Sequence, residues 1–294
     1  MIDYKGKIIV IAGPTASGKS DIAVKLAKKI NGYIINGDSR QVYKHLNIGT
    51  AKPLFDKQIS PSTYLLDGIK HYLFNFVDPK ENFTLFNYQQ SVKDILNKEN
   101  GVPILVGGTG LYIDSVVFNY ALTENDTTST KLQAMSLEEL KDLAKAYLND
   151  MNESDRENRH RLIRAIQRSG INQRKGEALN CLYFVLDVQK EVLAQRVKTR
   201  IEDMFKKGLL EENISLLEKG YTYNDKGMNS IGYIEFKEYF ENNISLEDVK
   251  AKIYKNTLSY IKRQKTWFRR NKESRWISDE NEVYYTASNF ILKK

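Results

Sequence analysis

The chain has 294 residues, of which 41% are hydrophobic and 28% are charged, proportions that are ordinary for a soluble globular protein. No apolar run approaches the roughly 18 residues of a membrane helix, and the single cysteine, Cys181, excludes an internal disulfide. We therefore expect a protein of a reducing compartment, the cytoplasm, with no signal peptide and no membrane partner. The formal net charge of +8 suggests a polyanionic partner.

The first element is a phosphate-binding loop between a strand and a helix. Residues 7–12 are an apolar, β-branched run that predicts a buried strand, and apolar spacing over residues 20–30 predicts a helix. Between them, the loop Gly13-Pro14-Thr15-Ala16-Ser17-Gly18-Lys19-Ser20 fits the pattern G-x-x-x-x-G-K-[ST]. In this context backbone N–H groups and the helix N-terminus would hold phosphate oxygens, Lys19 would reach the outer phosphate, and Ser20 Oγ would bind Mg²⁺.

Two further predicted strands are each followed by polar residues, at the edge of the sheet where the carboxyl ends of its strands lie. The strand 33–36 is followed by Asp38, and the strand 102–106 is followed by Gly107-Gly108-Thr109. Because ligands lie beyond the carboxyl ends of strands in open α/β sheets, Asp38 is a candidate general base or Mg²⁺ ligand, and Thr109 offers a hydroxyl. Both have a structural alternative as a helix N-cap. No acidic residue ends the strand 102–106, so the Walker-B partner of an ATPase is not evident.

The middle of the chain predicts a helical insertion. Residues 46–53 read as a turn-rich connector, 54–80 as irregular and aromatic, and 86–97 as a helix. The polar stretch 123–130 predicts a boundary, and helical spacing over 136–170 without strand signals predicts an all-helical insertion at 119–179. Arg161, Arg164 and Arg168 fall on one helix face, which suits phosphates and base edges, although pairing with nearby acids is the alternative.

The second half is the basic one. Residues 1–150 carry 17 Lys and Arg against 16 Asp and Glu, whereas residues 151–294 carry 28 against 21, and a Lys-rich solvated surface is the alternative to a polyanionic partner. After a strand at 182–187, a helix at 191–206 would bring Arg200 toward the phosphates, unless it forms a surface ion pair. A final helix from about residue 246 ends in interleaved basic and aromatic residues at 262–270, which suit RNA, while Trp267 and Phe268 could equally be core anchors. Residues 284–292 read as a short tail.

These elements predict an α/β fold, with a P-loop NTPase-like parallel sheet flanked by helices and a small all-helical insertion domain. The core would comprise residues 1–118 and 180–294, and the insertion residues 119–179.

Six motifs occur in one order: the phosphate loop at 13–20, Asp38-Ser39-Arg40-Gln41-Val42-Tyr43, Ile48-Gly49-Thr50-Ala51-Lys52-Pro53, Gly107-Gly108-Thr109-Gly110-Leu111-Tyr112, Ile231-Gly232-Tyr233 and Lys262-Arg263-Gln264-Lys265-Thr266-Trp267-Phe268-Arg269. From about residue 7 to 270, the chain closely resembles the tRNA dimethylallyltransferase (tRNA isopentenyltransferase) family. It departs from the usual family pattern at Gln167, Ile234 and Leu258.

The resemblance implies transfer of a dimethylallyl group from dimethylallyl diphosphate to the exocyclic amine of the adenosine 3′ of the tRNA anticodon, with release of diphosphate and with Mg²⁺ as cofactor. It implies that the loop Gly13–Ser20 holds the diphosphate, that Asp38 is the base, that Thr109 contacts the acceptor and that Arg200 faces the diphosphate. The residues that it assigns to tRNA contact are Asp38, Ser39, Arg40, Gln41, Thr109, His160, Arg161, Leu162, Ile163, Arg164, Lys262, Arg263 and Arg269. The partners would be the tRNA anticodon stem-loop and dimethylallyl diphosphate, and we expect a monomer.

Two other classes of function use part of these features. A P-loop nucleoside or nucleotide kinase would explain the loop and Arg200 but not the basic half. A non-catalytic RNA-binding module would explain the basic half but leaves Asp38 and Thr109 without a role.

Overall fold

A computed structural model of the chain describes residues 1–122, 130–167 and 175–292. Arg168 and most of the polar stretch 123–130 lie outside the described residues. The chain divides into two compact units. The larger consists of Ile2–Val117 and Leu179–Lys294, and the smaller consists of Met1 and Phe118–Ala178.

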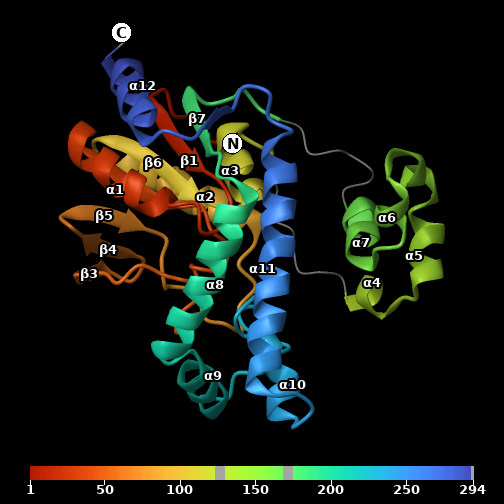
Figure 1. Cartoon of the computed structure of the whole chain (residues 1–294). Coiled ribbons are helices and arrows are strands. Elements are labelled where there is room, and N and C mark those ends of the chain that lie inside the picture. Colours follow the sequence, from red (N-terminus) through yellow and green to blue (C-terminus); the bar gives the residue numbers. More distant parts are fainter. Residues whose placement is uncertain (123–129, 168–174, 293–294) are drawn as a thin grey trace. The chain divides into compact units, whose positions relative to one another are not determined.

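The larger unit is built on an eight-stranded sheet in the order β3-β4-β5-β2-β6-β1-β7-β8 (Figure 1). Its strands are β1 (Ile8–Ala12), β2 (Gly32–Asn36), β3 (Lys57–Ser60), β4 (Thr63–Leu66), β5 (Ile69–Tyr72), β6 (Val102–Gly107), β7 (Cys181–Leu186) and β8 (Arg275–Ile277). The pairs β3–β4 and β4–β5 are antiparallel and all the others are parallel. The predicted α/β fold with a parallel core sheet is therefore confirmed, with an antiparallel extension at one edge.

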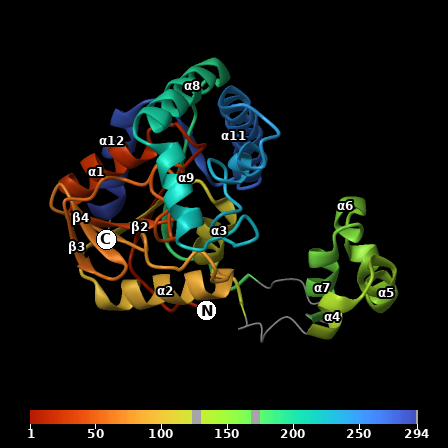
Figure 2. The same cartoon turned by 90° about the horizontal axis from the view of Figure 1, so that it is seen from below.

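Helices cover both faces of this sheet. Those of the larger unit are α1 (Lys19–Ile30), α2 (Leu85–Lys98), α3 (Gly110–Val117), α8 (Lys190–Lys206), α9 (Leu209–Glu218), the 3₁₀ helix η2 (Ile234–Phe236), α10 (Lys237–Phe240), α11 (Leu246–Phe268) and α12 (Glu280–Leu292). Alternate residues of β1 point to opposite faces, and Ile9 and Ile11 pack with side chains of α1 and α12. Figure 2 shows α2 and α3 on the other side of the strands from α1 and α12, and α8 beside α11 at the end where the phosphate loop lies.

Two expectations from the sequence are wrong. Residues 54–80 are not irregular, because β4 and β5 form a hairpin through Asp67 and Gly68, both with positive φ (53° and 77°), as a two-residue type I′ turn requires. The exposed side chains of β3 gave no apolar signal. Residues 284–292 are not a short tail either: they belong to α12, whose Val283, Tyr284 and Ala287 are buried against the sheet.

The smaller unit is helical in its described residues. Its elements are α4 (Thr130–Ala134), α5 (Leu137–Leu143), the 3₁₀ helix η1 (Lys145–Asp150), α6 (Glu153–Arg156) and α7 (Arg159–Gln167). Ser136 caps α5 by a reciprocal capping box with Glu139. The unit has its own apolar core, centred on Leu140, Ala144, Leu162 and Ile163. Across the described parts of both units, every helix is too short or too polar to span a bilayer.

Candidate active site

The phosphate loop lies between β1 and α1, as its sequence predicts. Gly18 directly precedes α1 with a left-handed φ of 92°, a conformation that costs glycine least. Lys19 Nζ donates to Pro14 O at 2.9 Å, so the cation is held over its own loop. Burial lowers the pKa of Lys19 to about 8, with Asp38 opposing this shift and Arg200 adding to it. Lys19 and Arg200 therefore repel each other, and an anion bound in the loop would offset this repulsion.

Arg200 lies at the phosphate loop and not in a surface ion pair. Its Nη1 donates to Thr15 Oγ1 at 3.1 Å, and burial lowers the pKa of the guanidinium. One turn earlier on α8, Arg196 Nη1 donates to Ala16 O at 3.3 Å. Two arginines of α8 thus contact the phosphate loop. This geometry favours the predicted diphosphate role of Arg200 over the ion-pair alternative.

Asp38 and Thr109 are brought together by the ends of β2 and β6. Asp38 Oδ1 accepts the Arg40 N–H at 2.8 Å, and the residues after it form a turn, so Asp38 does not cap a helix. Thr109 N–H donates to Gly37 O at 3.1 Å, while Thr109 Oγ1 accepts the Ser39 N–H at 3.0 Å. The Thr109 hydroxyl is therefore engaged by the loop that carries Asp38.

Gly107, the last residue of β6, makes room for the backbone that follows β2. A Cβ on Gly107 would lie 2.1 Å from Gly37 O, which is shorter than any tolerated contact with backbone. The ends of β2 and β6 can approach this closely only because Gly107 has no side chain. This close approach fixes the spacing between Asp38 and Thr109.

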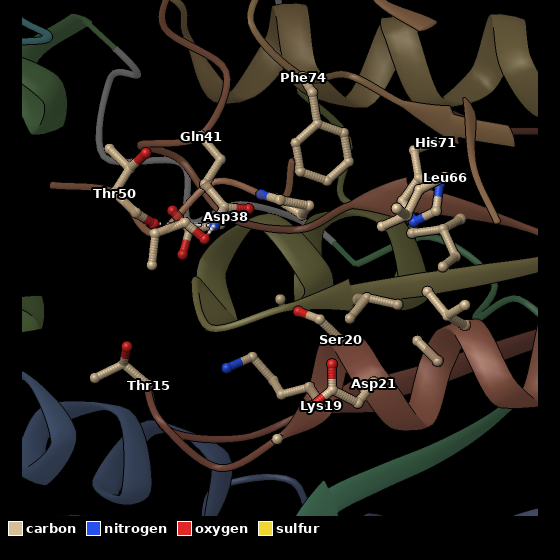
Figure 3. A pocket seen from close by; sticks show the side chains of 18 of the residues that line it. Thr15, Lys19, Ser20, Asp21, Asp38, Gln41, Thr50, Leu66, His71 and Phe74 are labelled. Carbon is tan, nitrogen blue, oxygen red and sulfur yellow. Dashed lines mark hydrogen bonds between the residues drawn. The ribbon is translucent and has the colours of Figure 1, made fainter. Parts of the chain in front are cut away.

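A cavity of about 300 Å³ lies over the phosphate loop. In Figure 3, the labelled residues on one side are Thr15, Lys19, Ser20 and Asp21, those on the other are Gln41, Phe74, His71 and Leu66, and Asp38 and Thr50 lie at the end toward which Lys19 points. The cavity therefore has a polar end at Lys19 and Asp38, and a less polar end where Leu66 and Phe74 meet apolar residues of α1 and β2.

A second cavity, of about 510 Å³, adjoins the first. The residues that line both are Thr15, Asp38, Thr50, Ala51 and Arg200. The second cavity is also lined by Thr109, Arg40, Tyr260 and Arg263. Burial, with the nearby Asp38 carboxylate, raises the pKa of Tyr260 to about 12, so its phenol stays protonated and can donate. We name the first the loop cavity and the second the helix cavity, because α11 lines it.

Sequence reasoning missed the residues that hold the Ile48–Pro53 loop against both cavities. The Glu212 carboxylate accepts the N–H groups of Ile48 and Gly49, at 3.0 and 3.3 Å, and the Tyr233 hydroxyl at 2.6 Å. Gln41 Nε2 donates to Thr50 O at 3.0 Å. A glutamate on the acidic surface helix α9 carries no signal for this contact. Tyr233, in the motif Ile231-Gly232-Tyr233, was the available clue.

The basic end of α11 divides into an exposed and a packed side. On the exposed side are Lys262, Arg263 and Arg269. Of the residues after β2 that are also assigned to tRNA, Arg40 is exposed and Ser39 is half-buried. Trp267 Nε1 donates to Asp114 Oδ2 at 2.7 Å, and Phe268 is fully buried. Both aromatic residues therefore hold the helix to the rest of the larger unit, as the core-anchor alternative predicts, and Trp267 keeps part of its surface exposed.

In the smaller unit, α7 carries the remaining residues assigned to tRNA. His160 and Arg161 are exposed and Arg164 is half-buried, while Arg161 forms an ion pair with Asp155. Leu162 and Ile163 are buried in the core of the unit. Their side chains pack with Leu140 of α5, as apolar residues at helical spacing do, and the tRNA contact assigned to these two positions stays a prediction.

At the three departures from the family pattern, Ile234 lines the helix cavity, Leu258 packs on the core between α8 and α11, and Gln167 ends α7.

The chain is similar to known proteins over most of its length. A family model described as "IPP transferase" matches residues 41–271. A tRNA dimethylallyltransferase of Bacillus mycoides (strain KBAB4) is 36% identical over 292 residues, covering 92% of this chain and 89% of the relative. The crystal structure of a tRNA isopentenylpyrophosphate transferase from Bacillus halodurans superposes with a TM-score of 0.73 at 29% identity, over 98% of this chain and 97% of that one.

A structure of a eukaryotic dimethylallyltransferase acting on tRNA superposes with a TM-score of 0.74 at 26% identity, over 90% of this chain and 70% of that one. The chain belongs to the tRNA dimethylallyltransferase family.

Proposed function

We propose that this protein transfers a dimethylallyl group from dimethylallyl diphosphate to the exocyclic amine of the adenosine 3′ of the anticodon in tRNA. The observation that carries the proposal is that two cavities share Asp38, Thr15 and Arg200. A donor in the loop cavity and an acceptor base in the helix cavity would meet at these residues. The kinase alternative is not favoured, because β6 ends in Gly107 and is followed by Gly108 and Thr109, not by the acid that phosphoryl transfer enzymes place there.

The loop cavity suits an allylic diphosphate. Backbone N–H groups of the loop, Lys19 and Arg200 would bind the diphosphate, and the five-carbon tail would lie against Leu66 and Phe74. Burial lowers the pKa of His71, so its ring adds no charge to this side. As the bond from the allylic carbon to oxygen breaks, its electron pair passes to the diphosphate, whose growing charge the cations stabilise.

Asp38 is suited to the base role and Thr109 to that of an orienting group. The adenine amine would attack the allylic carbon and form the new C–N bond, and its proton would pass to the Asp38 carboxylate. Thr109 Oγ1, held by the Ser39 N–H, would hydrogen-bond the acceptor. The base must leave the anticodon stack to reach this point, as in other enzymes that modify bases.

The residues present suit a Mg²⁺ ion held chiefly by the substrate. Ser20, at the start of α1, lines the loop cavity. Within the described parts of the chain, no group of three His, Cys, Asp or Glu residues could hold a metal. Mg²⁺ commonly keeps several waters and binds substrate phosphates with few protein ligands, so Ser20 Oγ and diphosphate oxygens fit. When bound, the ion would neutralise charge on the leaving diphosphate.

The larger unit has four exposed cations at positions assigned to tRNA: Arg40, Lys262, Arg263 and Arg269. The smaller unit, described by itself, carries Arg161 and Arg164 on α7. Such side chains suit the phosphates of the anticodon stem-loop. We propose that the protein acts as a monomer in the cytoplasm, where a lone cysteine such as Cys181 stays reduced.

A labelled-donor assay tests the proposal. The protein is mixed with unmodified tRNA, Mg²⁺ and labelled dimethylallyl diphosphate, and in parallel with ATP and a pool of nucleosides. We expect label in the tRNA without ATP, and its position next to the anticodon is checked by nuclease digestion. Phosphoryl transfer to a nucleoside without labelling of tRNA would overturn the proposal in favour of a kinase.

A further inference from the structure

Gln264 is a buried amide on a helix whose neighbouring residues are exposed cations. It lies on α11 and is 4% exposed, whereas Lys262 and Arg263 beside it face solvent. Its Oε1 accepts the Thr15 N–H at 3.0 Å and its Nε2 donates to Gly108 O at 2.9 Å. One side chain therefore joins the phosphate loop to the segment after β6 that carries Thr109.

The two hydrogen bonds of Gln264 fix two segments of the site. One would hold the donor and the other would orient the acceptor in the proposed reaction. Thr15 lines both cavities, and its hydroxyl also accepts from Arg200. Gly108 directly precedes Thr109, the acceptor-side hydroxyl. Gln264 thus connects the element that would hold the leaving diphosphate with the element that would orient the attacking amine.

The surrounding packing explains why Gln264 can reach both. A Cβ on Gly108 would lie 2.3 Å from Gln264 Nε2, and one on Gly110 would lie 2.1 Å from Trp267 Cδ1. The glycines after β6 therefore make room for α11. Trp267 Nε1, on the next turn of α11, donates to Asp114 Oδ2 at 2.7 Å, so two successive turns of the helix are held to the residues that follow β6. Tyr260, one turn earlier, lines the helix cavity together with Thr109.

We propose that Gln264 is a positioning residue that fixes the separation between the diphosphate and the acceptor amine, and ties both to the helix whose exposed side carries Lys262 and Arg263. The inference rests on the function proposed above. In-line displacement needs the reacting atoms within about 3–3.5 Å, and a misplacement of about 1 Å can cost roughly 100-fold in rate. Loss of the bridge should therefore slow the chemical step more than it weakens binding.

The first test is Gln264→Met, which keeps the length of the side chain and removes both hydrogen bonds. We expect the single-turnover rate of prenyl transfer to fall by about 10–100-fold, with tRNA affinity unchanged in a filter-binding assay. The matched control is Gln89→Met on α2. Gln89 is also fully buried and its Nε2 donates to Ser115 O at 2.7 Å, so the substitution removes a comparable bond away from both cavities.

The second test separates positioning from general damage to the fold. Gln264→Glu keeps an acceptor for the Thr15 N–H, but a carboxylate cannot donate to Gly108 O. A protonated carboxyl can do both, so the rate of this variant relative to wild type should rise as pH falls from 8 to 6. Burial at this position, where Gln264 is 4% exposed, favours the protonated form. Gln264→Met should show no such recovery.

The outcomes are distinct. If wild-type protein does not prenylate tRNA, the proposed function fails. If wild type is active and Gln264→Met turns over at the wild-type rate, the positioning role is refuted. If Gln264→Met and Gln89→Met lose stability and rate equally, and Gln264→Glu shows no recovery at low pH, Gln264 serves packing alone and the inference is overturned.

Discussion

Replacing Asp38 by asparagine removes the proposed base with little change of shape. The carboxylate Oδ1 accepts the Arg40 N–H at 2.8 Å, and the Asp38 N–H donates to Asn36 Oδ1 at 2.9 Å. An asparagine can keep both bonds, so the turn after β2 should survive. What is lost is the negative charge and the ability to accept a proton from the adenine amine.

Two effects of different size follow. General base catalysis contributes about 10²–10⁴-fold, so the single-turnover rate should fall by that factor, or by about 3–5 kcal/mol in the barrier. The second effect acts on Lys19. Its pKa, lowered to about 8 by burial, is supported by the charge of Asp38. Without that charge the pKa of Lys19 falls further, so the side chain loses its proton at a lower pH. Because diphosphate binds best to the protonated lysine, its affinity should then begin to decline at a lower pH.

The assay combines rapid-quench kinetics with calorimetry. Single-turnover rates of prenyl transfer are measured with saturating donor, and binding of inorganic diphosphate is titrated between pH 6.5 and 9. Wild-type affinity should decline above about pH 8, and that of Asp38→Asn should decline at lower pH. Asp94→Asn, which removes an exposed carboxylate on α2, is the control for a change in net charge.

The rate measurement and the binding measurement each test a separate role of Asp38. An unchanged rate in Asp38→Asn would remove Asp38 from the base role. A reduced rate with an unmoved pH dependence of diphosphate binding would mean that Asp38 acts on the acceptor without supporting the charge of Lys19. A large loss of tRNA affinity would assign the residue to RNA binding instead.

Three further predictions concern the edges of the site. Arg200→Lys keeps a cation but not the fork that donates to Thr15 Oγ1 at 3.1 Å, so single-turnover kinetics should show a fall of about 100-fold; a wild-type rate would place the leaving group elsewhere. Arg164→Ala should reduce the slope of log affinity for tRNA against log salt by about one, and an unaltered slope would mean that Arg164 contacts no phosphate. Trp267→Phe loses the 2.7 Å bond to Asp114 and should lower the free energy of unfolding by about 1–3 kcal/mol, measured in urea, with tRNA affinity unchanged; the reverse pattern would indicate stacking on RNA.

The parts of the site that sequence could predict are those encoded locally. Residues 13–20 fold as a phosphate loop because strand, glycines and helix are contiguous, and Asp38 and Thr109 follow predictable strands. The role of Arg200 needed the resemblance as well as the chemistry of a cation near phosphate. Each of these expectations used a few neighbouring residues and a rule about where ligands bind.

The parts that it could not predict depend on partners distant in the chain. Gln264 has ordinary neighbours in sequence, and its importance arises from bonds to Thr15 and Gly108. Glu212 is one of several acids on α9. Leu162 and Ile163 show a different limit: a motif match assigned them to tRNA, whereas their apolar side chains pack inside their own unit. The hairpin at Asp67 and Gly68 is an exception among the missed features, because its two turn residues alone were sufficient to predict it.

The place of β1 in the sheet has a consequence for how the protein is made. β1 pairs with β6 on one side and with β7 on the other, and the helices of the smaller unit lie between these two strands in the chain. During synthesis those helices leave the ribosome before β7 does, and their local contacts form quickly. The strand that carries the phosphate loop is among the first segments made, yet it keeps an open edge until residues 181–186 arrive. The sheet around the strand that carries the phosphate loop can therefore be completed only after residues 181–186 have been made.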